Sequence, residues 1–218
     1  MAWIIDDHFS TDHCRSQIPT RHAVPKATEA DPSSLYSGAF DTWFPALRAR
    51  YQEVQHAVLN AYPGLHLPSK HSSFAALSVN LGSQAVCVPH RDKGNLSYGI
   101  CTDFVLGDFD HTRGGHLVLH ESRHIAELRP GAILLFPSAC ITHENIPIQA
   151  GETRFSVTTY SSGGLRRFCD QGLQVRREWE AKDPEAVRVH DEAGAARWAA
   201  GCALLEDLEA LVARWPLN

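Results

Sequence analysis

The sequence has no long run of apolar residues and no basic segment followed by an apolar one near its start. The short segment Met1–Ile5 is followed at once by Asp6 and Asp7. A helix that crosses a membrane needs about 20 apolar residues, and a secretory leader needs an apolar core behind basic residues. We therefore expect an intracellular protein, nuclear or cytoplasmic, with no signal peptide and no transmembrane segment.

The cysteines form no recognisable framework. No pair stands in a C-x-x-C arrangement, and no set has the spacing of a zinc site. We therefore expect reduced thiols, most of them buried, as is usual inside cells. The six cysteines are Cys14, Cys87, Cys101, Cys140, Cys169 and Cys202.

The chain also lacks an excess of basic residues, since its formal net charge is −5 at pH 7. A protein that holds nucleic acid by charge alone has a positive balance instead. Nucleic-acid binding is not excluded, because an enzyme that extrudes a base needs only a local basic rim beside a pocket. Arg166-Arg167 and Arg176-Arg177 could form such a rim, although an ordinary solvated surface is the more common explanation of any single pair.

Length and hydrophobic content predict a single domain. The chain has 218 residues, of which 44% are hydrophobic, and this is enough to bury one full core. Within 1–218 we predict an irregular arm over 1–40, a supporting helix over 41–63, a β-rich core over 74–164 and two or three helices over 173–215. Prolines and small polar residues mark the arm, and apolar residues at helical spacing mark the helices.

Short segments rich in β-forming residues follow one another through the central part of the chain. Phe74–Asn80 and Gln84–Pro89 are separated by a Gly-Ser turn signal, and Ala132–Phe136 follows a Pro-Gly turn. Thr153–Tyr160 has the pattern of another strand. The sequence therefore predicts an α+β protein that is mainly β.

His90-Arg91-Asp92 directly follows one of these segments, and His143 lies in the connection after another. Side chains two residues apart on a strand point to the same side, so His90 and Asp92 can meet one metal ion. A distant histidine can complete the two-histidine, one-carboxylate face that holds Fe(II) with open positions. The sequence therefore predicts a non-haem iron site at His90, Asp92 and His143.

Two other histidine patterns are weaker candidates for a metal site. The His-x-Glu match at His190 falls in a predicted helix, where positions two apart diverge around the axis. His116, His120 and His124 could be misread as a metal-binding helix, but the preceding glycines and the alternating pattern favour two strands joined by a turn near Glu121. His116 stays a candidate for a place in the active-site cavity.

Arg154 and Ser156 share one face of the strand predicted over 153–160. A guanidinium beside a hydroxyl suits a carboxylate, because the planar guanidinium can donate two parallel hydrogen bonds. Taken singly, Arg154 could be a surface charge and Asp92 an ordinary turn residue. Their occurrence together, at the positions that an iron site needs, favours the functional interpretation.

The central part of the chain resembles the Fe(II)/2-oxoglutarate-dependent dioxygenases, whose pattern is His-x-Asp, a distal histidine and an arginine on the following strand. The resemblance implies a double-stranded β-helix, or jelly-roll, core with flanking N- and C-terminal helices. It implies that His90, Asp92 and His143 hold Fe(II), and that Arg154 and Ser156 bind the far carboxylate of the cosubstrate 2-oxoglutarate. Molecular oxygen (O2) would take the last position on the metal.

A closer resemblance is to the small fungal members of the TET/JBP family, and four segments carry it: Val88–Leu96, Gly107–Asp110, Gly114–Leu119 and Gly151–Ser156. It implies oxidation of the 5-methyl group of a pyrimidine, 5-methylcytosine or thymine, in nucleic acid. The implied partner is DNA with a methylated base. The chain lacks the cysteine-rich extension of the animal enzymes, so their regulation and partners do not carry over.

The residues that would contact a substrate are less sharply defined. Polar or aromatic groups near the predicted site are candidates, although turn, core and surface roles are as common for each of them. An oxygenase of a protein side chain or a small metabolite, an N-methyl nucleobase demethylase and a non-catalytic barrel remain alternatives. The sequence does not fix the oligomeric state, and we favour a monomer. The substrate candidates are Asn80, Asn95, Tyr98, Arg166 and Arg167.

Overall fold

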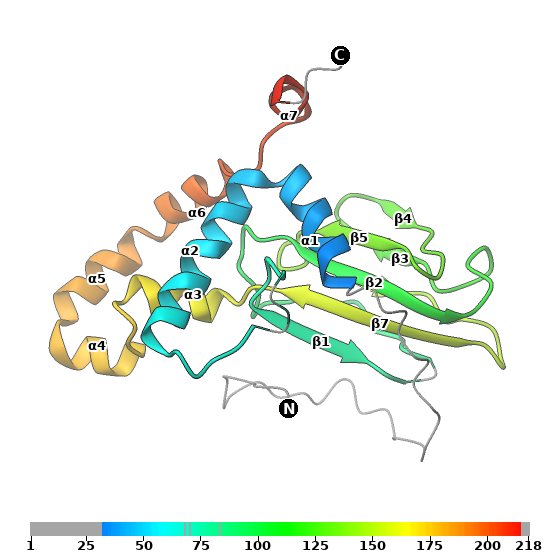
Figure 1. Ribbon diagram of the computed structural model, residues 1–218, viewed down its shortest axis with the longest axis horizontal. Helices are drawn as coiled ribbons and strands as arrows, with labels where there is room; N and C mark the ends of the chain where they lie inside the picture. Colours follow the sequence, from blue (N-terminus) through cyan, green and yellow to red (C-terminus); the bar gives the residue numbers. More distant parts are fainter. Residues whose placement is uncertain (1–31, 68, 70, 83, 215–218) are drawn as a thin grey trace.

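The computed structural model describes residues 32–67, 69, 71–82 and 84–214. This part of the chain contains seven helices and seven strands, and the strands lie together beside the helices α2 to α6 (Figure 1). Among these residues no helix is both long and apolar enough to cross a membrane. The predicted α+β class is confirmed, but the expectation that the protein is mainly β was wrong, because the described helices contain more residues than the described strands.

The first described element is helix α1 (Pro32–Trp43). Most of the predicted irregular arm lies outside the described residues, but residues 32–40 are helical, so the prediction was wrong for them. The sequence Asp31-Pro32 contains a common helix start signal, a capping residue followed by a proline. That signal outweighs the scattered small polar residues nearby.

Helix α2 (Pro45–Ala61) corresponds to the helix predicted over 41–63. The predicted helix is divided at Phe44, whose φ of −136° is not helical. The cause is local, because the ring of a proline disfavours a helical conformation for the residue before it. Leu47 and Tyr51 are among the apolar residues that α2 buries at helical spacing, as predicted.

The strands form two antiparallel sheets. The four-stranded sheet has the order β1-β7-β2-β5, and the three-stranded sheet has the order β4-β3-β6. Three of the four segments predicted as strands contain β1, β5 and β7. The strands are β1 (Ala76–Asn80), β2 (Cys101–Asp108), β3 (Leu117–Leu119), β4 (His124–Ala126), β5 (Ile133–Phe136), β6 (His143–Asn145) and β7 (Thr153–Tyr160).

The fourth predicted segment, Gln84–Pro89, forms no regular strand, yet the chain here runs beside the three-stranded sheet. The backbone N–H of Cys87 donates to the side-chain oxygen of Asn145 over 2.6 Å, and His90 forms an isolated antiparallel bridge with His143. With this segment included, every connection from β1 to β7 crosses between the sheets except the β3–β4 hairpin. This crossing pattern brings residues distant in sequence together between the sheets.

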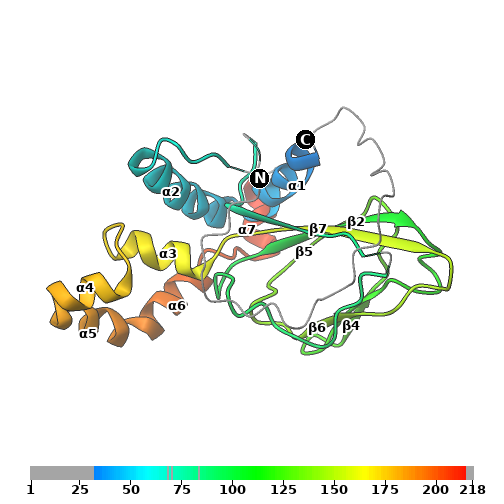
Figure 2. The ribbon, with the colours of Figure 1, turned by 90° about the horizontal axis from the view of Figure 1, so that it is seen from below.

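Two apolar clusters hold the layers together, and α1 and α2 lie over the four-stranded sheet on the side away from β4 and β6 (Figure 2). A fully buried apolar side chain stabilises the fold by about 1.5–3 kcal/mol, so each cluster is a substantial part of the core. The inner cluster joins both sheets and consists of Cys101, Val105, Phe109, Leu117, Leu128, Phe136 and Ile148. The outer cluster lies under the helices and consists of Phe40, Leu47, Tyr51, Phe74, Leu96 and Ile100.

Five helices follow the last strand. The prediction of two or three helices over 173–215 was too low, since four lie between residues 176 and 214. The apolar residues from Trp198 to Val212 do not form one buried face, because α6 ends at Cys202 and both Trp198 and Val212 are exposed. The helices are α3 (Gly163–Asp170), α4 (Arg176–Lys182), α5 (Pro184–Glu192), α6 (Gly194–Cys202) and α7 (Leu208–Arg214).

The structure describes five cysteines, of which Cys101, Cys140, Cys169 and Cys202 are free thiols. Burial is complete only for Cys101, and the other four are half-buried, so the predicted burial was overestimated. Cys14 lies outside the described residues. The half-buried thiols are Cys87, Cys140, Cys169 and Cys202.

Candidate metal centre

His90 and His143 face each other across a short antiparallel bridge. The backbone N–H of His90 donates to the carbonyl of His143 over 3.0 Å, and the N–H of His143 donates back over 2.9 Å. The centroids of the two imidazole rings are 4.3 Å apart. Backbone pairing therefore fixes the two histidines side by side before any metal binds.

Each imidazole has one nitrogen bound to the backbone and the other available to a metal. Nδ1 of His90 lies 2.8 Å from the carbonyl oxygen of Val88, and Nδ1 of His143 lies 2.9 Å from that of Ile141. A carbonyl oxygen can only accept, so Nδ1 carries the proton in both neutral rings and Nε2 keeps its lone pair. This is the usual way in which a metal-binding histidine is oriented.

The carboxylate of Asp92 completes the cluster. One potential ligand atom from each of His90, Asp92 and His143 lies within 4.8 Å of the others. In the described part of the chain this is the one group of three such side chains that could hold a metal ion. Two imidazoles and one carboxylate are the donor set of non-haem Fe(II) oxygenases, so the residues present fit this metal.

The electrostatics of the cluster prepare Asp92 and His143 for metal binding, but not His90. Burial alone would raise the pKa of Asp92, but hydrogen bonds from His90 and Ser138 hold it below its usual value. Burial lowers the pKa of His143, whereas the hydrogen bond to Asp92 raises the pKa of His90. Asp92 is therefore ionised and His143 neutral, while a proton competes with the metal for His90.

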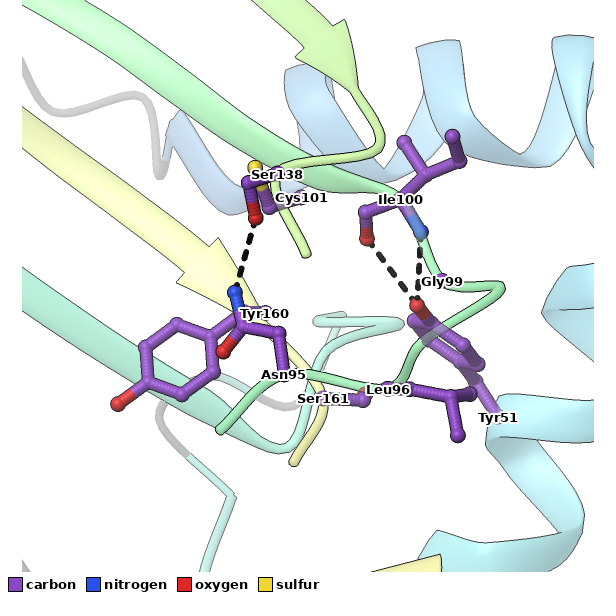
Figure 3. Close-up of a pocket in the computed structure, with 9 residues that line it drawn as sticks. All are labelled: Tyr51, Asn95, Leu96, Gly99, Ile100, Cys101, Ser138, Tyr160 and Ser161. Carbon is purple, nitrogen blue, oxygen red and sulfur yellow. Dashed lines mark hydrogen bonds between the residues drawn. The ribbon is translucent and has the colours of Figure 1, made fainter. Parts of the chain in front are cut away.

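Asn95 and Ser138 also contact Asp92, and Asn95 approaches the carboxylate oxygen that His90 does not. The backbone N–H of Asp92 donates to the carbonyl of Ser138 over 3.0 Å. The Asn95 amide nitrogen lies 3.3 Å from Asp92 Oδ2 and 3.0 Å from Ser138 Oγ, and Figure 3 shows the bond to Ser138. Asn95, a predicted substrate residue, thus has both amide protons engaged within the chain.

A network of side chains on the rim links the two ligand-bearing segments, and sequence reasoning missed it. Arg91, between the first two ligands, pairs with Glu121 and donates from Nε to Thr142 Oγ1 over 3.0 Å. Glu121 also accepts from the Thr142 backbone N–H over 2.6 Å, and hydrogen bonding to Thr142 lowers the pKa of Glu121 to about 2. Because Thr142 precedes His143, this network fixes both segments together.

Arg154 and Ser156 lie on β7, and each is only 3% exposed. Asn80 donates to Ser156 Oγ over 2.9 Å. A terminal nitrogen of Arg154 lies 3.5 Å from a carboxylate oxygen of Asp103, and the Arg154 Nε has no hydrogen-bond partner among the described residues. A buried guanidinium with so few acceptors fits the binding of a further carboxylate.

Asp103 is a candidate functional residue that sequence reasoning missed. It lies on β2 opposite Thr158 of β7 and is 8% exposed. It shares the inward face of β2 with Cys101 and Val105, which belong to the inner cluster. The available signal was an acidic residue at an inward position of a strand, and it stood outside the recognised motifs.

The remaining substrate candidates have ordinary structural environments. Tyr98 packs against the outer cluster, and a Cβ added at Gly201 would overlap its ring. Arg166 forms a 2.6 Å ion pair with Asp170 on helix α3. Arg167, on the same helix, is exposed. Helix α3 begins beside the metal-binding loop, because the Gly163 N–H donates to the Gly94 carbonyl.

The other histidine patterns are not brought together as metal sites in the described residues. The segment that contains His116, His120 and His124 forms the β3–β4 hairpin, as predicted. His120 Nε2 lies 3.0 Å from Glu144, and His124 is exposed. Nδ1 of His116 is buried without a partner among the described residues, which leaves its predicted role open.

No protein-family model and no curated protein sequence matches the chain. Among solved structures, NgTET1 in complex with 5mC DNA matches over 49% of this chain and 42% of its own, with 18% identity and a TM-score of 0.37. The viral collagen prolyl hydroxylase vCPH from Paramecium bursaria Chlorella virus-1, in a 2OG complex, matches over 50% of this chain and 68% of its own. Its identity is 13% and its TM-score 0.29. The chain thus spans less than half of the NgTET1 chain, and TM-scores this low do not establish a shared fold.

Proposed function

We propose that this chain is an Fe(II)- and 2-oxoglutarate-dependent dioxygenase. The observation that carries the proposal is the convergence of His90, Asp92 and His143, with both imidazoles presenting Nε2 and the carboxylate ionised. This donor set leaves positions on an Fe(II) ion open for other ligands. The buried, under-satisfied guanidinium of Arg154 supplies the second element that such an enzyme needs.

We further propose that the strands form a double-stranded β-helix. The support is the order in which the chain visits the two sheets, crossing at every connection except the β3–β4 hairpin. Jelly rolls are built from two such antiparallel sheets of Greek-key connectivity. In this arrangement the segment that carries His90 takes the place of the eighth strand, beside β6.

The roles of the chain's residues follow from their contacts. His90, Asp92 and His143 would hold Fe(II), while Asn95 and Ser138 orient the Asp92 carboxylate. Bound iron would supply the activation of O2 that converts 2-oxoglutarate to succinate and carbon dioxide and oxidises a substrate C–H bond.

Arg154 and Ser156 would bind the far carboxylate of 2-oxoglutarate. The guanidinium can donate two parallel hydrogen bonds, and the Ser156 hydroxyl, which accepts from Asn80 and contacts Asp103, can donate a third. Both residues are buried, so these hydrogen bonds form away from competing water. The chain would thereby fix the orientation of the cosubstrate relative to the metal.

For the substrate, we propose the 5-methyl group of a pyrimidine, 5-methylcytosine or thymine, in DNA with a methylated base. The support is the sequence resemblance over Val88–Leu96, Gly107–Asp110, Gly114–Leu119 and Gly151–Ser156. His143 is buried, but the side chains of His90 and Asp92 are partly exposed, which permits access by an extruded base.

Phosphate contacts would come from few residues. Arg166 is already paired with Asp170, whereas Arg167 and Lys93 are exposed and form no ion pair within the described part of the chain. Lys93 directly follows Asp92 in the metal-binding loop. With so few contacts, DNA affinity should weaken with salt along a shallow slope.

The test is to incubate the iron-loaded protein with 2-oxoglutarate, oxygen and matched oligonucleotides that carry 5-methylcytosine, thymine or N6-methyladenine. Oxidised nucleosides and succinate are then quantified by mass spectrometry. The proposal predicts oxidation of 5-methyl pyrimidines, most rapid where the base is mismatched or single-stranded, because extrusion then costs less. His143→Ala serves as the inactive control, and His124→Ala, at an exposed histidine outside the cluster, should behave as the parent.

Other outcomes would redirect the assignment. Loss of N6-methyl groups would indicate a nucleobase demethylase. Succinate without an oxidised nucleoside would indicate a protein side chain or small metabolite as the substrate. Absence of both activities would favour a non-catalytic barrel and contradict the proposed enzyme class.

A further inference from the structure

The buried acid beside Arg154 is not explained by the proposed cosubstrate site. Asp103 is 8% exposed, and its carboxylate lies 3.5 Å from a terminal nitrogen of Arg154 and 3.5 Å from the hydroxyl of Thr158. Arg154 and Thr158, which contact Asp103, lie on the same inward face of β7, and Ser156 lies between them. A carboxyl group of the chain therefore already lies against the guanidinium to which the far carboxylate of 2-oxoglutarate is expected to bind.

If Asp103 were ionised, binding of the cosubstrate would leave an uncompensated negative charge. Arg154 and an ionised Asp103 together carry no net charge, and the carboxylate of 2-oxoglutarate would add a negative charge in a buried place. Burying an uncompensated charge costs more free energy than most single hydrogen bonds return. Two carboxylates that share a site commonly avoid this cost by holding one proton between them.

We propose that Asp103 takes up one proton from solvent when the far carboxylate of 2-oxoglutarate binds to Arg154, and so acts as the residue that couples cosubstrate affinity to pH. This inference rests on the proposed function. The protonated Asp103 would be neutral and could donate its O–H to the incoming carboxylate. Arg154 would then keep a single negative partner, and its unpaired Nε would gain an acceptor.

The surroundings of Asp103 support this assignment of the proton. Burial raises the pKa of Asp103, and the opposing effect of Arg154 is smaller. Cys101 on the same strand has a pKa raised to about 12 by burial, so it does not titrate near neutral pH. His143 on β6 also interacts electrostatically with Asp103, but its Nε2 is held by the metal in the loaded protein. Leu134, the neighbour on β5, does not titrate.

The experiment is calorimetric titration of 2-oxoglutarate into the Mn(II)-loaded protein. Near pH 8, repeating the titration in two buffers of different ionisation enthalpy gives the number of protons taken up per ligand. The parent should take up about one proton, and its affinity should fall about tenfold per pH unit above the pKa of the free Asp103. Asp103→Asn should take up none and bind with little pH dependence. Asp108→Asn, at the exposed end of the same strand, is the matched control and should follow the parent.

The possible failures are distinguishable. Binding of 2-oxoglutarate by the parent without proton uptake would overturn this inference and leave the proposed function standing. An unchanged pH slope in a folded Asp103→Asn variant would overturn it as well. Absence of 2-oxoglutarate binding by the parent would contradict the proposed function and the inference with it. The number of protons that the parent takes up per bound 2-oxoglutarate tests the inference even if the variant does not fold.

Discussion

Replacing Asn95 separates two roles that this residue could have. Its amide nitrogen lies 3.3 Å from Asp92 Oδ2 and 3.0 Å from Ser138 Oγ, so the structure indicates that it orients a metal ligand. We predict that Asn95→Ala lowers metal affinity. A residue that contacts only the substrate would leave metal affinity unchanged and raise the KM for the substrate.

The size of the effect follows from the two hydrogen bonds. A bond to a charged group contributes about 1.5–3 kcal/mol, and the length of the bond to Asp92 places it at the lower end. Residues that orient metal ligands typically change metal affinity by about 10–100-fold. We therefore expect a loss of about tenfold, or ~1.4 kcal/mol, for Asn95→Ala.

The assay is competition for Co(II) between the protein and a chelator, followed through the visible absorption of the bound metal. Asn60→Ala, at an exposed position on α2, is the matched control and should leave the affinity unchanged. Equal Co(II) affinity of the parent and a folded Asn95→Ala variant would refute the orienting role. A raised KM for an oligonucleotide in that same variant would assign Asn95 to the substrate.

Three further predictions concern the same site. Arg154→Lys should weaken 2-oxoglutarate binding by about 10–100-fold, because an ammonium cannot reproduce the two parallel hydrogen bonds of the guanidinium. Equal affinities of the variant and the parent in calorimetry would contradict this prediction. Glu121→Gln should lower Co(II) affinity less than Asn95→Ala does, since the pair of Glu121 with Arg91 is exposed to solvent, and a larger loss would contradict that ranking. Asp92 raises the pKa of His90, so protons compete with the metal for this histidine. Co(II) affinity should therefore rise from about pH 6 to about pH 8. An affinity that does not change with pH would exclude His90 as a ligand.

The core of the site was predictable because its signals are local or periodic. The two-residue spacing of His90 and Asp92 and the strand-like segments before His143 and around Arg154 are visible in the sequence. The crossing pattern of the sheets then joins these segments, and the His90–His143 bridge confirms that the two histidines meet. Their roles in binding iron and cosubstrate stay predictions.

The supporting residues were not predictable because their contacts join distant segments. Arg91 meets Glu121 through a loop beyond β3, and Asp103 meets Arg154 only through the pairing of β2 with β7. Glu121 does not differ in its sequence context from an ordinary surface residue, and Asp103 gives only the weak signal of an acid at an inward position of a strand. An ion pair also weakens the prediction that Arg166 contacts the substrate, since Asp170, one helical turn away, neutralises its charge.

Helix boundaries were predictable only where a strong terminal signal occurs. Asp183 caps α5 through the N–H of Ala186, whereas the break before Pro45 falls inside the helix predicted over 41–63. Asp207 caps α7 in the same way through the N–H of Ala210, but apolar residues continue at helical spacing from α6 into α7. The sequence pattern therefore indicates one helix where the structure has two, α6 and α7.

The most direct test of the central claim is the anaerobic titration of the apoprotein with Fe(II) and 2-oxoglutarate, followed by visible absorption. If His90, Asp92 and His143 hold Fe(II) with positions open for a chelating ligand, a charge-transfer band should appear when 2-oxoglutarate is added. The band should reach its limit at about one equivalent of Fe(II) and be absent in His143→Ala. No band in the parent, or an undiminished band in His143→Ala, would contradict the account.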